Sequence, residues 1–176
     1  MAELLRQRVE ELAAALRVTT SVTWTLEKWC EKQGLVKPPA NIQACVESGS
    51  QLPVPEAFQG AFPAGERLRH RRVDLTCQGL SLCHADNWYA PSRLSPKMNA
   101  RLEKTREPFG RVVRQTGIHR RTLDCRVLWT EEAPPPSSAH TPVISVLAFV
   151  CREDGVALSL VREICTAALL GVGDSC

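Results

Sequence analysis

The sequence changes from a helical to a strand-like periodicity near residue 41, and this change constrains the fold more than any other feature. Before it, apolar residues recur every three or four positions in residues 1–17 and 22–34, as on one face of a helix. After it, segments rich in β-branched, aromatic or alternating residues are separated by Gly, Pro or Ser clusters. These strand-like segments are 41–47, 66–77, 80–90, 118–129, 142–152 and 156–164. Because most connections are too short for crossover helices, we predict a six-stranded, largely antiparallel sheet.

One further helix is predicted between the third and fourth strands. Ser95 supplies an N-cap and Pro96 a first-turn proline, and apolar residues then recur every four positions up to Lys104. This helix is expected to lie on the sheet. The connections 49–63 and 131–141 carry Pro and Ser and are predicted to be loops too polar to pack.

The size and composition of the chain fit one domain. Of its 176 residues, 44% are hydrophobic and 23% are charged, which is enough apolar material for a core. The sequence therefore predicts a single α+β domain over 1–176, with helices flanking the antiparallel sheet and a short tail at 171–176.

The charge balance argues against a nucleic-acid partner. The net charge is +3, from 22 Lys and Arg against 19 Asp and Glu, whereas nucleic-acid binders usually concentrate more positive charge on one face. No segment reaches the ~18 apolar residues needed to cross a bilayer. Residues 1–17 contain acids and lack the pattern of a signal peptide. We expect a cytoplasmic monomer without a membrane span.

Arginines gather in two segments of the sequence, whereas the cysteines are scattered along it. Arginines gather in 67–72 and 111–126; most should be exposed, and one or two are candidates for binding an anionic small molecule. The eight cysteines lie mostly in apolar runs without a CxxC and should be small buried hydrophobes. Cys77, Cys83 and His84 do not have the spacing of a zinc site. We predict neither a metal nor a cofactor.

The stretch 67–110 contains the parts of a carboxylate-binding site. An arginine-bearing strand is followed by an aromatic and proline-containing run, 86–94, and then by the turn Pro108-Phe109-Gly110. Arginine and turn amides donate hydrogen bonds to carboxylates, and the aromatic corner provides an apolar wall. Within the run, Asp86 and Asn87 are assigned to turn chemistry and Trp88 to the core. The sequence predicts a cavity for a small organic acid.

Four local matches resemble the chorismate pyruvate-lyase family, whose members cleave chorismate to 4-hydroxybenzoate and pyruvate. The resemblance spans roughly Val18 to Leu170, and the matches occur in the order of the family. They are the helix from Thr20 to Gly34, the strand from Arg72 to Cys77, the turn Pro108-Phe109-Gly110-Arg111 and the strand from Leu158 to Glu163. In the turn, Phe109 replaces a leucine of the family.

The resemblance implies a role for each matched residue. It implies that Arg72 binds the ring carboxylate of the substrate, together with the backbone amides of Val22 and Phe109 beside Gly110. It also implies that Glu163 is the catalytic acid at the ether oxygen. Since the ring becomes aromatic as pyruvate leaves, the reaction needs no redox cofactor or metal.

Three alternatives remain open from the sequence. In the first, Glu163 forms an ion pair with Arg162 or another arginine instead of acting as an acid. In the second, the domain binds a small aromatic acid without catalysis, like the effector domains of a group of bacterial transcription regulators, although residues 1–34 are too short for the winged helix of such a regulator. In the third, the chain is a lyase for a related enolpyruvyl or aromatic acid, with a cavity reshaped by Phe109.

Overall fold

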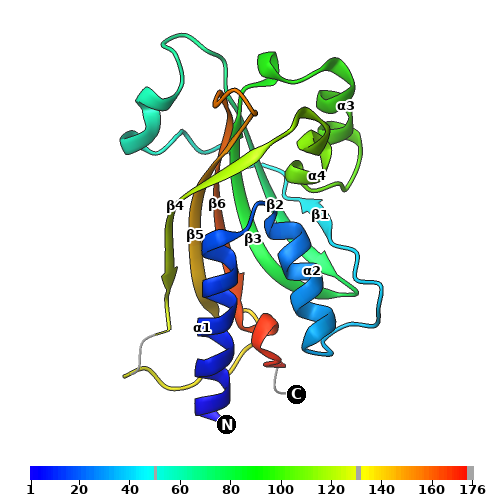
Figure 1. The fold of residues 1–176 in the computed structure, drawn as a ribbon, viewed down its shortest axis with the longest axis vertical. Helices are drawn as coiled ribbons and strands as arrows, with labels where there is room; N and C mark the ends of the chain where they lie inside the picture. The colour runs from blue at the N-terminus through cyan, green and yellow to red at the C-terminus, as the bar shows by residue number, and fades with distance from the viewer. Residues whose placement is uncertain (50, 130–131, 174–176) are drawn as a thin grey trace.

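The computed structural model of the chain describes residues 1–49, 51–129 and 132–173. Its strands form one antiparallel six-stranded sheet in the order β1-β2-β3-β6-β5-β4 (Figure 1). The strands are β1 (Gln43–Val46), β2 (Arg69–Cys77), β3 (Leu80–Tyr89), β4 (His119–Val127), β5 (Pro142–Cys151) and β6 (Ala157–Thr166). The prediction of an α+β fold with a six-stranded antiparallel sheet and flanking helices is confirmed.

Two N-terminal helices cover part of one face of this sheet. They are α1 (Ala2–Val18) and α2 (Val22–Lys32), and they lie side by side in front of the strands (Figure 1). Leu12 and Leu26 are completely buried in the core cluster that these helices share with the sheet. The N-cap of α2 is Ser21, whose side chain accepts a hydrogen bond from the Trp24 amide at 3.3 Å. This cap fixes the point at which the first turn of α2 meets the sheet.

A second group of helices covers the same face farther along the strands. The predicted helix is α3 (Pro96–Lys104), and it is followed by α4 (Phe109–Val113), where the sequence predicted only a turn. One helical turn places the apolar residues of α4 on the side that faces the sheet. There they are buried against Tyr89 and Val161. Short 3-10 turns are η1 (Glu56–Ala61), η2 (Pro91–Arg93), η3 (Arg114–Thr116) and η4 (Ala167–Leu170).

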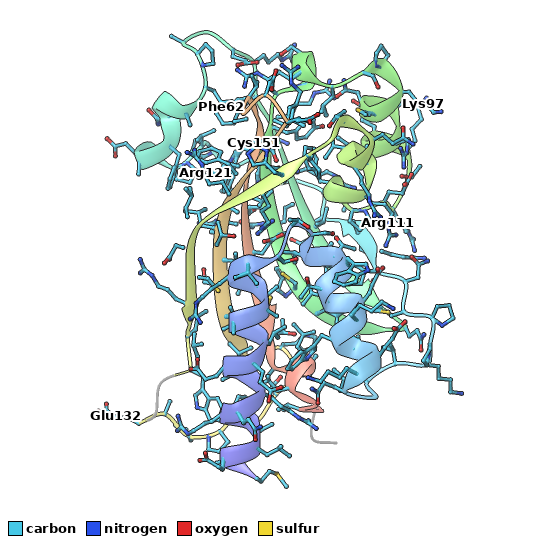
Figure 2. The ribbon with its side chains drawn as sticks, viewed as in Figure 1. Phe62, Lys97, Arg111, Arg121, Glu132 and Cys151 are labelled. Atoms are coloured by element: carbon cyan, nitrogen blue, oxygen red, sulfur yellow. The ribbon has the colours of Figure 1, made fainter. Side chains whose placement is uncertain are left out.

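The opposite face of the sheet is covered at one end by the connection 51–68. Phe58 and Phe62 meet the ring of Phe149 edge-on, with centroids 6.1 and 6.4 Å apart. Phe62 and Arg121 lie at this end of the molecule in Figure 2, and the Arg121 guanidinium lies 5.2 Å from the Phe149 centroid. The prediction that 49–63 is too polar to pack is therefore wrong, because its aromatic residues dock on the sheet.

The second predicted loop lies away from α4, near the N-terminal end of α1 (Figure 1). Of its residues 131–141, residue 131 lies outside the described ranges. Ala139 is buried, and its carbonyl accepts a hydrogen bond from the Ala168 amide at 2.9 Å. The described part of this loop therefore packs against η4, contrary to prediction. Within the described ranges, no helix combines the length and apolar character needed to cross a membrane.

Candidate functional site

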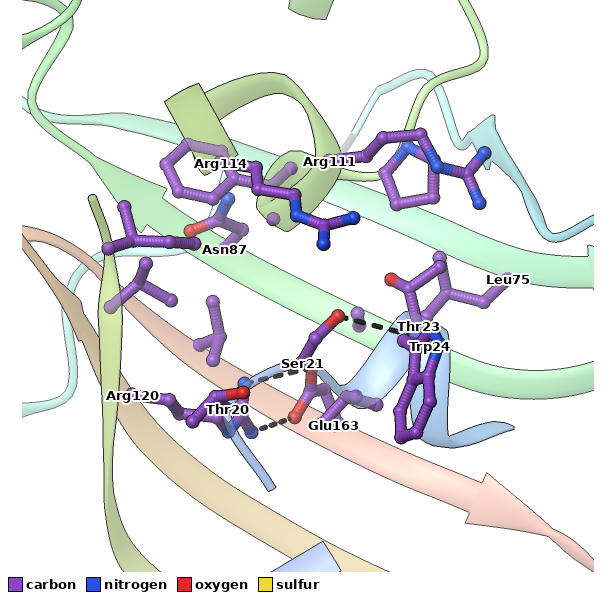
Figure 3. A pocket seen from close by; sticks show the side chains of 18 of the residues that line it. Thr20, Ser21, Thr23, Trp24, Leu75, Asn87, Arg111, Arg114, Arg120 and Glu163 are labelled. Atoms are coloured by element: carbon purple, nitrogen blue, oxygen red, sulfur yellow. Dashed lines mark hydrogen bonds and ion pairs between the residues drawn. The ribbon is translucent and has the colours of Figure 1, made fainter. Parts of the chain in front are cut away.

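A cavity of about 560 Å³ lies between the sheet and the two groups of helices (Figure 3). This volume is within the range of ~300–1,000 Å³ that is usual for small-molecule sites. The start of α2 forms one wall, and α4 with the turn after it forms the other. The apolar lining comes mainly from Val73, Leu75, Ala85, Phe109, Val150 and Val161.

The alternation of side chains along β2 decides which arginine reaches the cavity. Successive residues of a strand point to opposite faces of a sheet. Arg71, Val73 and Leu75 line the cavity. Arg72 and Asp74 point to the other face, where Arg72 binds Asp86. The cavity therefore receives Arg71, one residue before the arginine that the sequence analysis selected.

Arg71 is a buried cation without a carboxylate partner among the described residues. Arg71 is only 7% exposed, and its Nη2 atom donates a hydrogen bond to the carbonyl oxygen of Glu107 at 3.3 Å. Its Nε atom is buried and has no hydrogen-bond partner in the described structure. Burial lowers the pKa of Arg71 because it disfavours the charged form. An anion bound in the cavity would offset this cost.

Asn87 lies directly opposite Arg71 on the neighbouring strand β3. It is 4% exposed, and neither its Nδ2 nor its Oδ1 atom has a hydrogen-bond partner among the described residues. Its assignment to turn chemistry is wrong, because it lies within a strand and lines the cavity. Buried amides without partners are rare in folded proteins, so this one calls for a ligand or water.

Glu163 lines the same cavity and forms an ion pair with Arg120 of β4 (Figure 3). Both Nη atoms of Arg120 donate to the carboxylate, Nη1 at 3.4 Å from Oε1 and Nη2 at a short distance from Oε2. Both side chains are less than 10% exposed. An arginine partner for Glu163 was one of the alternatives left open by the sequence. The partner is Arg120, whereas Arg162 points to the opposite face and binds Asp86.

The rim of the cavity carries further positive charge. Arg111 donates to Glu27 Oε1 at 2.5 Å and to the Ile42 carbonyl at 3.2 Å. Arg114 is exposed and forms no ion pair with any described residue. Among the lining residues, four arginines face two glutamates, and both glutamates are already paired. The excess of two positive charges favours an anionic ligand.

The first residues of α2 and α4 also line the cavity. Val22 is the first residue of α2, and first-turn amides have no acceptor within their own helix. Phe109 and Gly110 are the first and second residues of α4 and line the opposite wall. The structure thus brings together the predicted residues Val22, Phe109, Gly110 and Glu163.

The predicted residue Arg72 lies outside this group. Its Nε and Nη2 atoms donate to Asp86 Oδ1 and Oδ2 at 2.8 and 3.0 Å, so its hydrogen-bonding capacity is used on the opposite face. A shift of one residue along a strand exchanges the two faces. The apolar residues Val73, Leu75 and Cys77 already indicated that odd positions face the core, which would have selected Arg71.

The donors of the cavity suit an anion better than a metal ion. They are guanidinium, amide and backbone N–H groups, which bind carboxylates and phosphates. No group of three or more His, Cys, Asp or Glu residues in the described part of the chain could hold a metal ion.

Comparison with known proteins gives a sequence relative and several solved structures of similar fold. No family model matches the chain. The uncharacterized protein y4mC of Sinorhizobium fredii is 37% identical over 150 residues, which cover 78% of this chain and 62% of that protein. The chain therefore spans less than two thirds of the length of this relative.

The similar structures include PhnF and the ligand-binding domain of a putative transcription regulator. PhnF from Mycobacterium smegmatis matches with a TM-score of 0.55 and 19% identity, over 93% of this chain and 80% of that chain. Its effector domain alone matches with a TM-score of 0.54 and 18% identity, over 84% of this chain and 88% of that chain. The ligand-binding domain of a putative GntR-family transcriptional regulator from Bordetella bronchiseptica matches with a TM-score of 0.50 and 13% identity, over 71% of this chain and 85% of that chain. At these identities the likeness establishes a shared fold, which is the chorismate lyase-like fold.

Proposed function

We propose that this domain binds a small organic acid and holds its carboxylate on Arg71. The observation that carries the proposal is a buried guanidinium with no carboxylate partner among the described residues, facing a cavity of about 560 Å³. Hydrogen bonds between a guanidinium and a carboxylate are roughly twice as strong as neutral ones. Val22, Phe109 and Gly110 line the same cavity, and we assign their first-turn amides as additional donors.

The rest of the cavity suits the body of such an acid. Its walls are aliphatic and aromatic side chains from the sheet and α4, which favour a ring or a hydrocarbon chain. The fold is also that of the effector domain of PhnF and of the GntR-family ligand-binding domain, which supports a binding module over an enzyme.

Cleavage of chorismate, or of a related enolpyruvyl acid, is the second candidate function. Glu163 favours it, because a carboxyl group shares the cavity with Arg71. However, Arg120 holds that carboxylate through two nitrogen atoms, and a carboxylate in such a pair accepts protons in hydrogen bonds and donates none. Proton transfer to an ether oxygen would require the pair to open first. Binding without catalysis therefore has the stronger support.

The test combines thermal unfolding with a turnover assay on the same preparation. We expect 4-hydroxybenzoate or another aromatic acid to raise the melting temperature of the wild type and of Arg72→Ala, but not of Arg71→Ala. The ligand-induced shift is compared within each variant, because Arg72→Ala should itself lower the starting temperature. Identical shifts in all three proteins, or none in the wild type, would contradict the proposal.

Chorismate then distinguishes the two candidates. Incubation without metal or nucleotide, followed by chromatography, should leave chorismate unchanged in a binding module. Equimolar release of 4-hydroxybenzoate and pyruvate, lost in Glu163→Gln, would make the chain a lyase instead.

The proposal concerns the domain that these residues form. We infer one binding domain over 1–176, since the helices and the sheet share continuous core clusters. Because the chain spans 62% of y4mC, the activity of a longer relative would include whatever its other residues contribute. Action as a cytoplasmic monomer remains a prediction from the sequence.

A further inference from the structure

We infer that Asn87 recognises a hydroxyl group on the carbon next to the ligand's carboxylate, so that the cavity selects 2-hydroxy acids. This inference rests on the proposed function, in which Arg71 holds the carboxylate. It adds a specificity-determining residue to that site and defines the chemical class of the ligand.

The position of Asn87 follows from the strand register. Arg71 and Asn87 are direct partners across β2 and β3, and both face the cavity. The Cβ atoms of such partners are typically ~4.5–5.5 Å apart. The Asn87 amide and the Arg71 side chain thus enter the same cavity from neighbouring positions, and we place the carbon next to the bound carboxylate beside this amide.

The amide has unused capacity of both kinds. Nδ2 can donate two hydrogen bonds and Oδ1 can accept two, yet neither atom has a partner among the described residues. The next strand offers none, because the register partner of Asn87 on β6 is Val161. A carboxylate satisfies Nδ2 and the Arg71 Nε atom, since both are donors. It leaves Oδ1 unpaired, and a donor on the ligand would remove that cost.

The charges around the amide determine which donor fits. A hydroxyl or an ammonium group on the adjacent carbon could each donate to Oδ1. An ammonium group would enter a cavity lined by four arginines, in which Glu27 and Glu163 are already paired with Arg111 and Arg120. Repulsion disfavours the ammonium group, whereas a neutral hydroxyl meets no such penalty. The site therefore favours 2-hydroxy acids over both the parent acids and the 2-amino acids.

The experiment uses two matched sets of acids. One set is phenylacetate, mandelate, phenylglyoxylate and phenylglycine; the other is hexanoate, 2-hydroxyhexanoate, 2-oxohexanoate and 2-aminohexanoate. Within a set only the substituent next to the carboxylate changes, from none to donor, acceptor or cation. Titration calorimetry should show the 2-hydroxy acid binding about tenfold more tightly than the parent and the 2-oxo acid, with the 2-amino acid weakest.

Two variants then assign the preference to Asn87. Asn87→Leu should bind the parent acid but lose the tenfold preference for the hydroxy acid. Gln115→Leu, which removes an exposed amide outside the cavity lining, should keep that preference. Should Asn87→Leu fail to fold, the comparison of the acids on the wild type still tests the selectivity.

The outcomes separate this inference from the proposed function. Equal binding of parent and hydroxy acids, with both lost in Arg71→Ala, would overturn the role of Asn87 and leave the acid-binding site intact. A preference that persists in Asn87→Leu would likewise overturn it. Absence of binding by every acid of both sets would overturn the proposed function and this inference with it.

Discussion

The two faces of β2 and β3 carry similar polar residues but satisfy them differently. On the helix-covered face, Arg71 and Asn87 are buried and carry nitrogen and oxygen atoms that no described residue hydrogen-bonds. On the opposite face, Asp86 accepts hydrogen bonds from Arg72 and Arg162, and His70 Nε2 lies 2.8 Å from its Oδ1 atom. The face that carries Asp86 is called the satisfied face, because its polar groups hydrogen-bond to one another. The face that carries Arg71 and Asn87 is called the unsatisfied face, because some of their polar atoms have no hydrogen-bond partner among the described residues.

This difference separates a structural role from a functional one. Buried polar groups normally find partners within the protein, and groups that do not are concentrated at binding and catalytic sites. Arg72 forms its ion pair with Asp86 whether or not a ligand is present. Arg71 has no carboxylate partner among the described residues, so an anion in the cavity would supply its counter-ion. Substitutions on the two faces should therefore act on different observables, stability on one and binding on the other.

The largest effect is expected when the central acid of the satisfied face is neutralised. Asp86→Asn leaves two partly exposed guanidinium groups without their buried counter-ion. Breaking a fully buried pair costs about 3 kcal/mol or more, and the exposure of the two arginines reduces the expected loss to about 2.5 kcal/mol. Urea unfolding measures the loss. The matched control is Asp154→Asn, because Asp154 pairs with Arg152 at an exposed turn, where such a pair contributes less than about 1 kcal/mol. Equal losses in the two variants would remove the distinction between the faces.

The two neighbouring arginines should respond in opposite ways to the same substitution. Arg72→Met leaves Asp86 with fewer donors and should cost about 2 kcal/mol of stability. Arg71→Met removes a buried cation that lacks a carboxylate partner, so stability should stay within about 1 kcal/mol of the wild type or rise. Urea unfolding of both variants measures this contrast. A large loss in Arg71→Met would show that its charge is satisfied without a ligand.

The pH dependence of stability should come from the satisfied face. Burial acts to raise the pKa of Asp86, but hydrogen bonds from Arg72, Arg162 and His70 outweigh it and lower the pKa to about 2, from 3.8. A lowered folded-state pKa contributes stability above the unfolded value, and this contribution is lost as the pH falls from about 4 to about 2. The difference between the two pKa values corresponds to about 2 kcal/mol. Urea unfolding from pH 6 to pH 2.5 should therefore show the gap between wild type and Asp86→Asn narrowing by about 1.5 kcal/mol, because part of the contribution persists until the pH falls below the folded pKa.

The sequence predicted the strands well, and the reason lies in their alternation. Segment 66–77 alternates apolar and polar residues from Val73 onward, and β2 occupies Arg69–Cys77. The helix α4 was missed because five residues are too few to display a helical period. Packing of its apolar side chains on the sheet, which no local pattern reveals, is what holds this turn.

The residues that line the candidate cavity were predicted in part, and the two omissions have different causes. Arg71 could have been predicted from the sequence, because it lies at an odd-numbered position like the buried apolar residues of β2. The family resemblance selected Arg72 instead. The partner of Glu163 was beyond reach: Arg120 lies 43 residues away in sequence, on a strand separated from β6 by β5. The order of strands in the sheet brings these two residues together, and the sequence patterns predicted the strands but not their order.

The smallest effect is expected at Trp24, on the rim of the unsatisfied face. Trp24 is 57% exposed and lines the cavity, whereas Trp29, Trp88 and Trp129 are buried elsewhere. Trp24→Phe should change stability by less than about 0.5 kcal/mol, because little packing is lost. It should also remove most of the change in tryptophan emission that an aromatic acid causes on binding, since Trp24 is the indole beside the ligand. An unchanged emission response in Trp24→Phe would place the ligand near one of the buried indoles, away from this cavity.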